Sequence, residues 1–158
     1  MRKKITSPLP EVTPRTSQES WIDLERLAQV EVTSEDGAHP IESALVPGAG
    51  PGWRAAQPGQ QTIRVRLDEP QRLRRILLVF EERERARTQE FVLRWSADGG
   101  RTYREIVRQQ YNFSPPGTPR EVENYIAELE GVTVVELTVV PDVGGGDSCA
   151  SLTMLRLG

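Results

Sequence analysis

Short runs in which apolar and polar residues alternate occur along much of the chain. Apolar residues take every second position within residues 28–32, 63–67 and 91–95, and the residues between them are polar except for Val92. This period of two is typical of a strand with one buried face and one wet face. Residues 76–80, Ile-Leu-Leu-Val-Phe, are apolar throughout and predict a central strand covered on both faces. The pattern predicts a sheet of antiparallel strands.

Turn residues mark where one of these strands ends and the next begins. The sequence Ala-Asp-Gly-Gly at 97–100 predicts a tight turn, because glycine adopts the positive φ that such turns require. A hairpin of strands 89–96 and 101–110 is therefore expected.

The C-terminal part of the chain contains two more apolar runs. Residues 132–140 are rich in β-branched side chains and end at Pro141, which cannot donate a hydrogen bond to a sheet. They predict a strand. A glycine-rich link follows over residues 143–147, and the apolar character of residues 150–157 predicts a closing strand.

Two segments carry a helical pattern. Trp21, Leu24 and Leu27 stand three residues apart and predict a short helical turn at the start of the domain. Residues 118–121 match a capping box with proline at the first helical position. The apolar residues of 119–130 fit helical spacing, but part of them also fits the alternation of a strand, so the local pattern leaves both structures open.

Composition excludes several classes of protein. The chain has 158 residues, one His, one Cys and a formal net charge of −3. A single Cys149 excludes an internal disulfide, and one His with one Cys excludes a zinc site built from several such ligands. No apolar run approaches the roughly 18 residues of a membrane span. The basic residues form no uninterrupted stripe of the kind that binds nucleic acid. No cofactor is expected.

Residues 1–20 differ from the rest of the chain. They contain Pro8, Pro10 and Pro14 and few large aliphatic side chains, so we expect a disordered lead before one domain over residues 21–158. The prolines also interrupt the apolar stretch that a secretory signal needs, which favours a cytoplasmic location.

The order of these elements resembles the galactose-binding-like jelly roll of the discoidin, or coagulation factor five/eight type C, superfamily. The resemblance covers residues 27–157. It depends on Val-Thr-Ser-Glu-Asp at 32–36, the loop leading through Ala44 and Leu45 to Trp53, Gln-Gln-Thr-Ile-Arg at 60–64, and Ser-Ala-Asp-Gly-Gly at 96–100 before Tyr103. It implies an all-β, antiparallel β-sandwich with only a short helical turn near the N-terminus. In that superfamily the segment equivalent to residues 121–129 is extended, so we prefer a strand there.

The resemblance also implies a non-catalytic binding module, with carbohydrate as the favoured ligand. Aromatic, amide and guanidinium groups on loops are the candidate contacts, because flat rings stack on sugars and arginine forks bind anions. The candidates are His39, Trp53, Arg54, Arg87, Tyr111 and Asn112. Trp53 is either a structural plug or a binding platform. Residues 111–113 form either a loop-borne site, in which case Tyr111→Ala should abolish binding, or the cover of that loop.

The chain departs from the superfamily in one loop. Sugar-binding members often hold calcium through an Asp-Gly-Asn sequence before the Trp, whereas residues 45–52 contain no acidic side chain. Calcium favours six to eight oxygen ligands that include carboxylates. We therefore expect no structural calcium, and no other metal site is indicated.

A second function stays open, that of an intracellular protein-interaction domain using the charged loop 81–87 or a sheet face. Acidic and basic residues alternate in this loop, which is typical of a solvated segment rather than of the paired carboxylates of a glycosidase. His39 is the one histidine that a catalytic triad could use. We expect a protein that is not an enzyme, and the sequence indicates no oligomeric state.

Overall fold

The computed structural model of the chain describes residues 21–158, and the predicted lead over residues 1–20 lies outside them. Strands dominate the described part, and no helix in it is long and apolar enough to cross a membrane. In chain order its elements are α2 (Leu24–Leu27), β1 (Ala28–Val32), α3 (Glu42–Leu45), β2 (Trp53–Pro58), β3 (Gln61–Glu81), β4 (Arg87–Ser96), β5 (Arg104–Phe113), β6 (Arg120–Val140), β7 (Cys149–Leu152) and β8 (Met154–Leu157).

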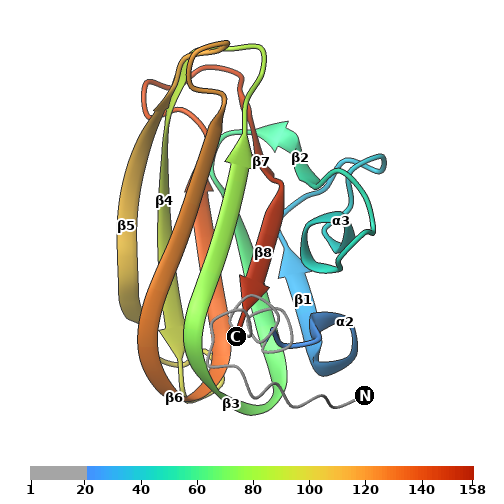
Figure 1. The fold of residues 1–158 in the computed structure, drawn as a ribbon, viewed down its shortest axis with the longest axis vertical. Coiled ribbons are helices and arrows are strands. Elements are labelled where there is room, and N and C mark those ends of the chain that lie inside the picture. The colour runs from blue at the N-terminus through green and yellow to red at the C-terminus, as the bar shows by residue number, and fades with distance from the viewer. Residues whose placement is uncertain (1–20) are drawn as a thin grey trace, which may run out of the picture.

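The long strands β3 and β6 pair along their whole length and bend together. The first half of β3 pairs with the second half of β6, from Gln61 opposite Val139 to Arg66 opposite Val134. The second half of β3 pairs with the first half of β6, and the register shifts between these two stretches. Such irregularities bend a ladder. The bend folds the β3–β6 pair over on itself, so that each strand contributes to both layers of a sandwich (Figure 1).

Every strand pair among residues 21–158 is antiparallel. One layer runs in the order β1, first half of β3, second half of β6, β4, β5. The other contains β8, the second half of β3 and the first half of β6, and β2 forms a small separate pair with β7. The prediction of an all-β antiparallel sandwich of jelly-roll type is confirmed.

Apolar side chains from both layers fill the space between them. Phe80 of β3 stacks on Phe91 of β4 with ring centroids 5.2 Å apart. Leu93 and Leu137 from the other layer are also fully buried. The predicted central strand 76–80 is confirmed, because β8 and β6 flank it and Phe80 is 0% exposed.

The structure also decides the open points of the sequence pattern. Residues 119–130 contribute to β6, so the strand is confirmed and the local helix signal is overridden by pairing with β3. The predicted strands 63–67 and 76–80 are two halves of β3. The single closing strand over 150–157 is wrong. It is split at Thr153, whose N–H donates to the carbonyl of Val79, and β7 and β8 join different sheets.

The predicted hairpin is confirmed, although its loop extends to residue 103. The Asp98 carboxylate accepts hydrogen bonds from the Ser96 and Thr102 hydroxyls and from the backbone N–H groups of Arg101 and Thr102. These bonds hold the pKa of Asp98 far below its usual value. Gly99 has a φ of 77°, as a tight turn requires.

Candidate ligand-binding site

The segments that bound a pocket meet at the end of the sandwich opposite the C-terminus, and Figure 1 shows their backbone. The pocket has a volume of about 390 Å³ and is bounded by segments that are far apart in the sequence. His39 comes from the loop after β1, and residues 51–54 lead into β2. Residues 81–85 connect β3 to β4, and residues 147–149 and 151–153 belong to β7 and its flanks.

The loop after β1 and the start of β2 form the first wall. The Asp36 N–H donates to the carbonyl of Arg54 (2.8 Å), and the Arg54 N–H donates to the carbonyl of His39 (3.1 Å). Nδ1 of His39 lies 3.4 Å from Oδ2 of Asp36. The backbone N–H of Ala38, with a smaller contribution from the His39 ring, holds the pKa of Asp36 below its usual value. An ionised Asp36 favours the tautomer with the proton on Nδ1, which leaves Nε2 of His39 as an acceptor.

Gly52 and Trp53 form the floor. A Cβ on Gly52 would lie 2.7 Å from the carbonyl oxygen of Leu152, so only glycine permits this close approach, and its φ is 122°. Trp53 is 1% exposed and donates its ring N–H to the carbonyl of Ser34 (3.0 Å). Trp53 therefore packs as a structural plug beneath the pocket and presents no open ring face.

The β3–β4 loop forms the second wall and is organised by Glu82. One carboxylate oxygen of Glu82 accepts the backbone N–H groups of Glu84 (3.0 Å) and Arg85 (3.1 Å). The other accepts Nε of Arg87 at 2.6 Å. Burial alone would raise the pKa of Glu82, but the bonds from Arg87 and the two backbone amides outweigh burial and hold the pKa below its usual value. Glu82 therefore acts as an ionised structural acceptor that shapes the loop.

Arg85 joins this loop to the segment before β7. Its guanidinium donates to Asp147 at 2.6 Å and to the Ser148 hydroxyl at 3.4 Å. Both charged side chains are more than half exposed, so solvent screens the pair. The contact therefore links two walls of the pocket but contributes little to stability.

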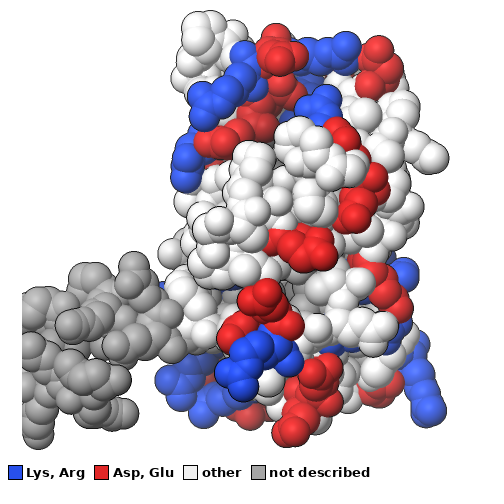
Figure 2. Space-filling view, turned by 90° about the vertical axis from the view of Figure 1, so that its right-hand side faces the viewer, with Lys and Arg blue, Asp and Glu red and all other residues white. Residues whose placement is uncertain are grey.

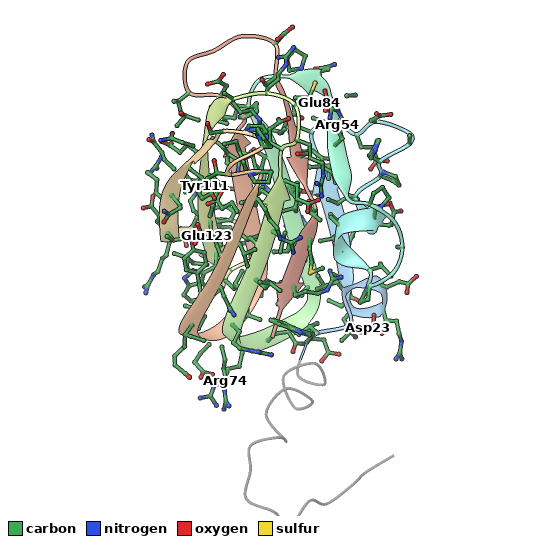
Figure 3. The ribbon with its side chains drawn as sticks, turned by 45° about the horizontal axis from the view of Figure 1, so that its top comes forward. Asp23, Arg54, Arg74, Glu84, Tyr111 and Glu123 are labelled. Carbon is green, nitrogen blue, oxygen red and sulfur yellow. The ribbon has the colours of Figure 1, made fainter. Side chains whose placement is uncertain are left out.

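Two exposed charges at the pocket keep their polar atoms available. The guanidinium of Arg54 and the carboxylate of Glu84 make no hydrogen bond or ion pair to any other residue in the described range 21–158. Figure 3 shows both side chains at the same end of the sandwich. The pocket thus offers a free donor group and a free acceptor group on facing segments.

Arg87 lies elsewhere than predicted, because it points inward. Its side chain is 1% exposed, its Nη1 donates to the carbonyl of Pro141 at 2.7 Å, and its guanidinium lies over the ring of Phe113. With Glu82 as its ion partner, it connects the β3–β4 loop to the interior and does not line the pocket.

Tyr111 and Asn112 also do not line the pocket, and the structure places residues 111–113, for which the sequence leaves two alternatives open, in a strand. They belong to β5, which stays paired with β4 as far as Phe113 opposite Arg87. Successive side chains of a strand point to opposite faces. Tyr111 faces inward, edge-on to Phe113, and donates to the carbonyl of Arg120 (2.9 Å), whereas Asn112 accepts from the Thr88 hydroxyl (2.7 Å) on the outer face.

Sequence reasoning did not assign three of the polar residues around the pocket. Glu84 and Arg85 stand in the alternating charge run, whose pattern indicates a solvated loop and carries no signal of where that loop lies. Asp147 follows a glycine run and becomes part of the wall through Arg85 alone. Half-buried Cys149 also lines the pocket.

Neither the pocket nor the loop before Trp53 fits a metal ion. No group of three or more His, Cys, Asp or Glu side chains in the described part of the chain is arranged to hold one. The loop at residues 45–52 presents no carboxylate. This donor set does not fit the calcium of the superfamily's Asp-Gly-Asn loop.

Charges on the surrounding surface are mixed in sign. Figure 2 shows the face that carries β1, β2 and the two helices, with acidic and basic side chains interleaved at its upper and lower ends and uncharged and acidic side chains between them. Nucleic acid favours a continuous basic stripe. This face presents no such stripe.

Comparison with known proteins assigns the chain to a family. The family model described as the F5/8 type C domain matches residues 29–146. The chain belongs to the F5/8 type C domain family. This agrees with the resemblance read from the sequence. A search of the curated proteins found no match to this chain.

Solved structures of carbohydrate-binding modules share this F5/8 type C fold. The family 32 module of C. perfringens NanJ, in complex with galactose, is 16% identical with a TM-score of 0.64, over 87% of this chain and 96% of that one. CpGH89CBM32-5 from Clostridium perfringens, in complex with GalNAc-β-1,3-galactose, is 19% identical with a TM-score of 0.60, over 87% and 99%. A pectin-binding module is 17% identical with a TM-score of 0.60, over 84% and 91%.

One match is to part of a larger enzyme. The chain aligns with 26% of a Ruminococcus gnavus GH29 fucosidase, at 10% identity and a TM-score of 0.65. At these identities the likeness shows the fold, and the ligand has to be argued from the pocket.

Proposed function

We propose that this F5/8 type C domain is a non-catalytic carbohydrate-binding module that holds a sugar in the pocket at the loop end. The observation that carries the proposal is that the exposed guanidinium of Arg54, the ring of His39 and the carboxylate of Glu84 all line one pocket of about 390 Å³. That volume is near the small end of the roughly 300–1,000 Å³ typical of ligand sites.

The donors and acceptors of the pocket suit sugar hydroxyl groups. A hydroxyl both donates and accepts, and Arg54 offers donors while His39 Nε2 and Glu84 offer acceptors. Charged partners make stronger hydrogen bonds than neutral ones. A sugar with neighbouring hydroxyl groups would bridge the two walls.

The pocket recognises its ligand through these polar groups. Trp53 is the one Trp, Tyr or Phe among the described residues that line it, and it is 1% exposed. Stacking on an aromatic face therefore contributes little here. A site without a stacking platform selects for the positions of hydroxyl groups, and we expect weak binding to a single sugar unit.

The chemistry of the acidic residues favours binding over catalysis. A glycosidase needs a carboxylic acid whose pKa is raised so that it stays protonated near neutral pH. Glu82 has its pKa shifted downward by Arg87 and by backbone amides, after burial is taken into account. It accepts hydrogen bonds at both oxygens and is not poised to donate a proton.

Structural neighbours support the same ligand class. Modules of this fold are solved with galactose and with GalNAc-β-1,3-galactose. We propose that this chain binds a related carbohydrate without calcium, because its loop before Trp53 has no carboxylate.

A glycan array tests this proposal, using the wild-type protein, Arg54→Ala and Arg101→Ala. Arg101 is a matched control, since it is an exposed arginine in the β4–β5 loop, at the far end of β4 from the pocket. Wild type and Arg101→Ala should bind one sugar class, and Arg54→Ala should lose at least tenfold in affinity. Adding a chelator should change nothing. A blank array, or equal binding by Arg54→Ala, would contradict the proposal.

A further inference from the structure

We propose that the first half of β6 is an interaction edge, through which two copies of this chain pair antiparallel about a two-fold axis at Asn124. This surface is separate from the pocket and does not depend on the proposed function.

The edge has backbone groups that point away from the sheet. In its layer, the first half of β6 pairs with β3 on one side, and no described strand pairs with it on the other (Figure 1). The backbone N–H of Glu82, directly after β3, donates to the carbonyl of Pro119. This bond shows that Pro119 and every second residue after it point their backbone polar groups toward β3. Alternate residues of an antiparallel strand bond to alternate sides. The N–H and C=O groups of Val122, Asn124 and Ile126 therefore face the open side.

Tyr111 reaches this edge at one end only. Its hydroxyl donates to the carbonyl of Arg120 (2.9 Å). Arg120 precedes Val122 by two residues, so the carbonyls of both residues point to the open side. From Val122 onward, the N–H and C=O groups on the open side pair with no strand among residues 21–158.

Between Arg120 and Glu128, the outer face of this edge carries no charged side chain to protect it against pairing. Proteins protect edge strands with proline, lysine, charges or bulges. Here Val122 is 53% and Ile126 is 78% exposed, and they flank the uncharged Asn124. Ile126 is the most exposed large apolar side chain among the described residues.

The residues are complementary to a second copy of themselves. With Asn124 opposite Asn124 of the second copy, Val122 lies opposite Ile126, and Arg120 lies opposite Glu128. Apolar pairs and opposite charges placed directly across a ladder both stabilise it. An isologous contact of this kind closes as a dimer.

Neighbouring charges extend this complementarity. Arg120 pairs with Glu81 of β3 at 3.1 Å, and Glu128 pairs with Arg72 at 2.8 Å. In the dimer, Glu81 and Arg120 of one copy lie next to Glu128 and Arg72 of the second copy. Acidic and basic side chains then alternate across the contact.

Other registers of the same parity lose this match. A two-fold at Val122 places Arg120 opposite Asn124, and a two-fold at Ile126 places Asn124 opposite Glu128 and Val122 opposite Glu130. Only the axis at Asn124 pairs both apolar residues with each other. The contact is short, so the dimer should be weak and depend on concentration.

Disulfide trapping tests the register. In a Cys149→Ala background, Asn124→Cys would place two sulfurs across a directly opposed pair, whose Cα atoms lie about 5.5 Å apart, within disulfide range. Val122→Cys is the matched control. Val122 is also exposed, but in this register it is offset by four residues from Val122 of the second copy, roughly 13 Å along the strand.

Under mild oxidation at high protein concentration, Asn124→Cys should give at least five times more covalent dimer than Val122→Cys. Equal yields from the two variants would overturn the register. Thermal unfolding of the reduced variants checks that both are folded.

Sedimentation of the wild-type protein under reducing conditions, so that Cys149 forms no disulfide between copies, gives an independent readout. The mean mass should rise with concentration, and Ile126→Lys should abolish the rise, whereas Val143→Lys, at an exposed valine in the loop before β7, should not. A wild type that stays monomeric at millimolar concentration would overturn the proposal.

Discussion

The loop end of the sandwich and the edge strand β5 both carry residues that the sequence nominates for binding, and the structure uses them differently. At the loop end, separate segments converge and leave Arg54 and Glu84 with free polar groups. On β5, Tyr111 and Asn112 point to opposite faces, and each has a hydrogen-bond partner.

The difference follows from the geometry of the backbone. A strand divides adjacent residues between two faces, so neighbours in sequence do not form one site. Loops at the end of a sandwich bring together residues that are distant in sequence, as they do for His39 and Asp147. Polar groups on such loops stay free when the scaffold already satisfies the backbone.

The largest effect is expected from removing the floor of the pocket. Trp53→Ala takes away a fully buried indole and its bond to Ser34, so the free energy of unfolding should fall by about 3–5 kcal/mol. Arg54→Ala, one residue further on and exposed, should change it by less than about 0.5 kcal/mol. Denaturant unfolding measures both. A loss below about 1 kcal/mol for Trp53→Ala would show that the indole does not support the pocket.

The interior near Glu121 should lose stability as the pH rises. This is the opposite of the loop end, where the lowered pKa values of Asp36 and Glu82 give stability that is lost as the pH falls. Glu121 is 1% exposed, one of its oxygens has no partner among the described residues, and the other accepts from Gln89 (3.2 Å). Burial, with a contribution from neighbouring Glu123, raises the pKa of Glu121 from its ordinary value of 4.5 to about 8.

Between these two pKa values the folded protein binds more protons than the unfolded chain, so stability falls as the pH rises through this window. From pH 5 to pH 8 the fall due to Glu121 should be about 2–4 kcal/mol, since one pKa unit corresponds to about 1.4 kcal/mol. Glu121→Gln should remove it and be more stable than wild type at pH 8. Glu105→Gln, at an exposed site, is the control. An unchanged pH profile in Glu121→Gln would refute this assignment.

A smaller loss of stability than for Trp53→Ala, and the sharpest contrast with the loop end, is expected for Tyr111→Ala. This change removes the edge-on contact with Phe113 and the bond to Arg120, and should lower the free energy of unfolding by about 1–2 kcal/mol. Because Tyr111 lies outside the pocket, sugar affinity should be unchanged. This is the opposite of the outcome expected if residues 111–113 formed a loop-borne site. Loss of affinity in Tyr111→Ala would move the site to β5.

Much of the fold could be predicted from the sequence because its causes are local. Alternation of apolar and polar residues marks β1, β4 and the first half of β3, and the turn at 97–100 carries its own chemistry. The bend that joins both halves of β3 into one strand has no comparable local signal. It depends on pairing with β6, more than 50 residues away.

Part of the candidate site could also be predicted, because two of its residues have a local signal in the sequence. His39 stands in a loop, and Arg54 stands at the start of β2 directly after a loop rich in glycine and proline, where exposed polar groups are common. The place of Glu84 and Asp147 depends on which loops meet at one end of the sandwich. Arg87 stands within an exposed charge run in the sequence, yet its guanidinium is buried because Glu82, Pro141 and Phe113 surround it.

A nuclear magnetic resonance titration with the sugar identified on the array tests the central claim most directly. Backbone amide shifts should change at His39, at 52–54, at 83–85 and at 147–149, and should saturate with one dissociation constant. Shifts confined to residues 109–113, or spread evenly over the surface, would contradict the assignment of the loop-end pocket as the carbohydrate site.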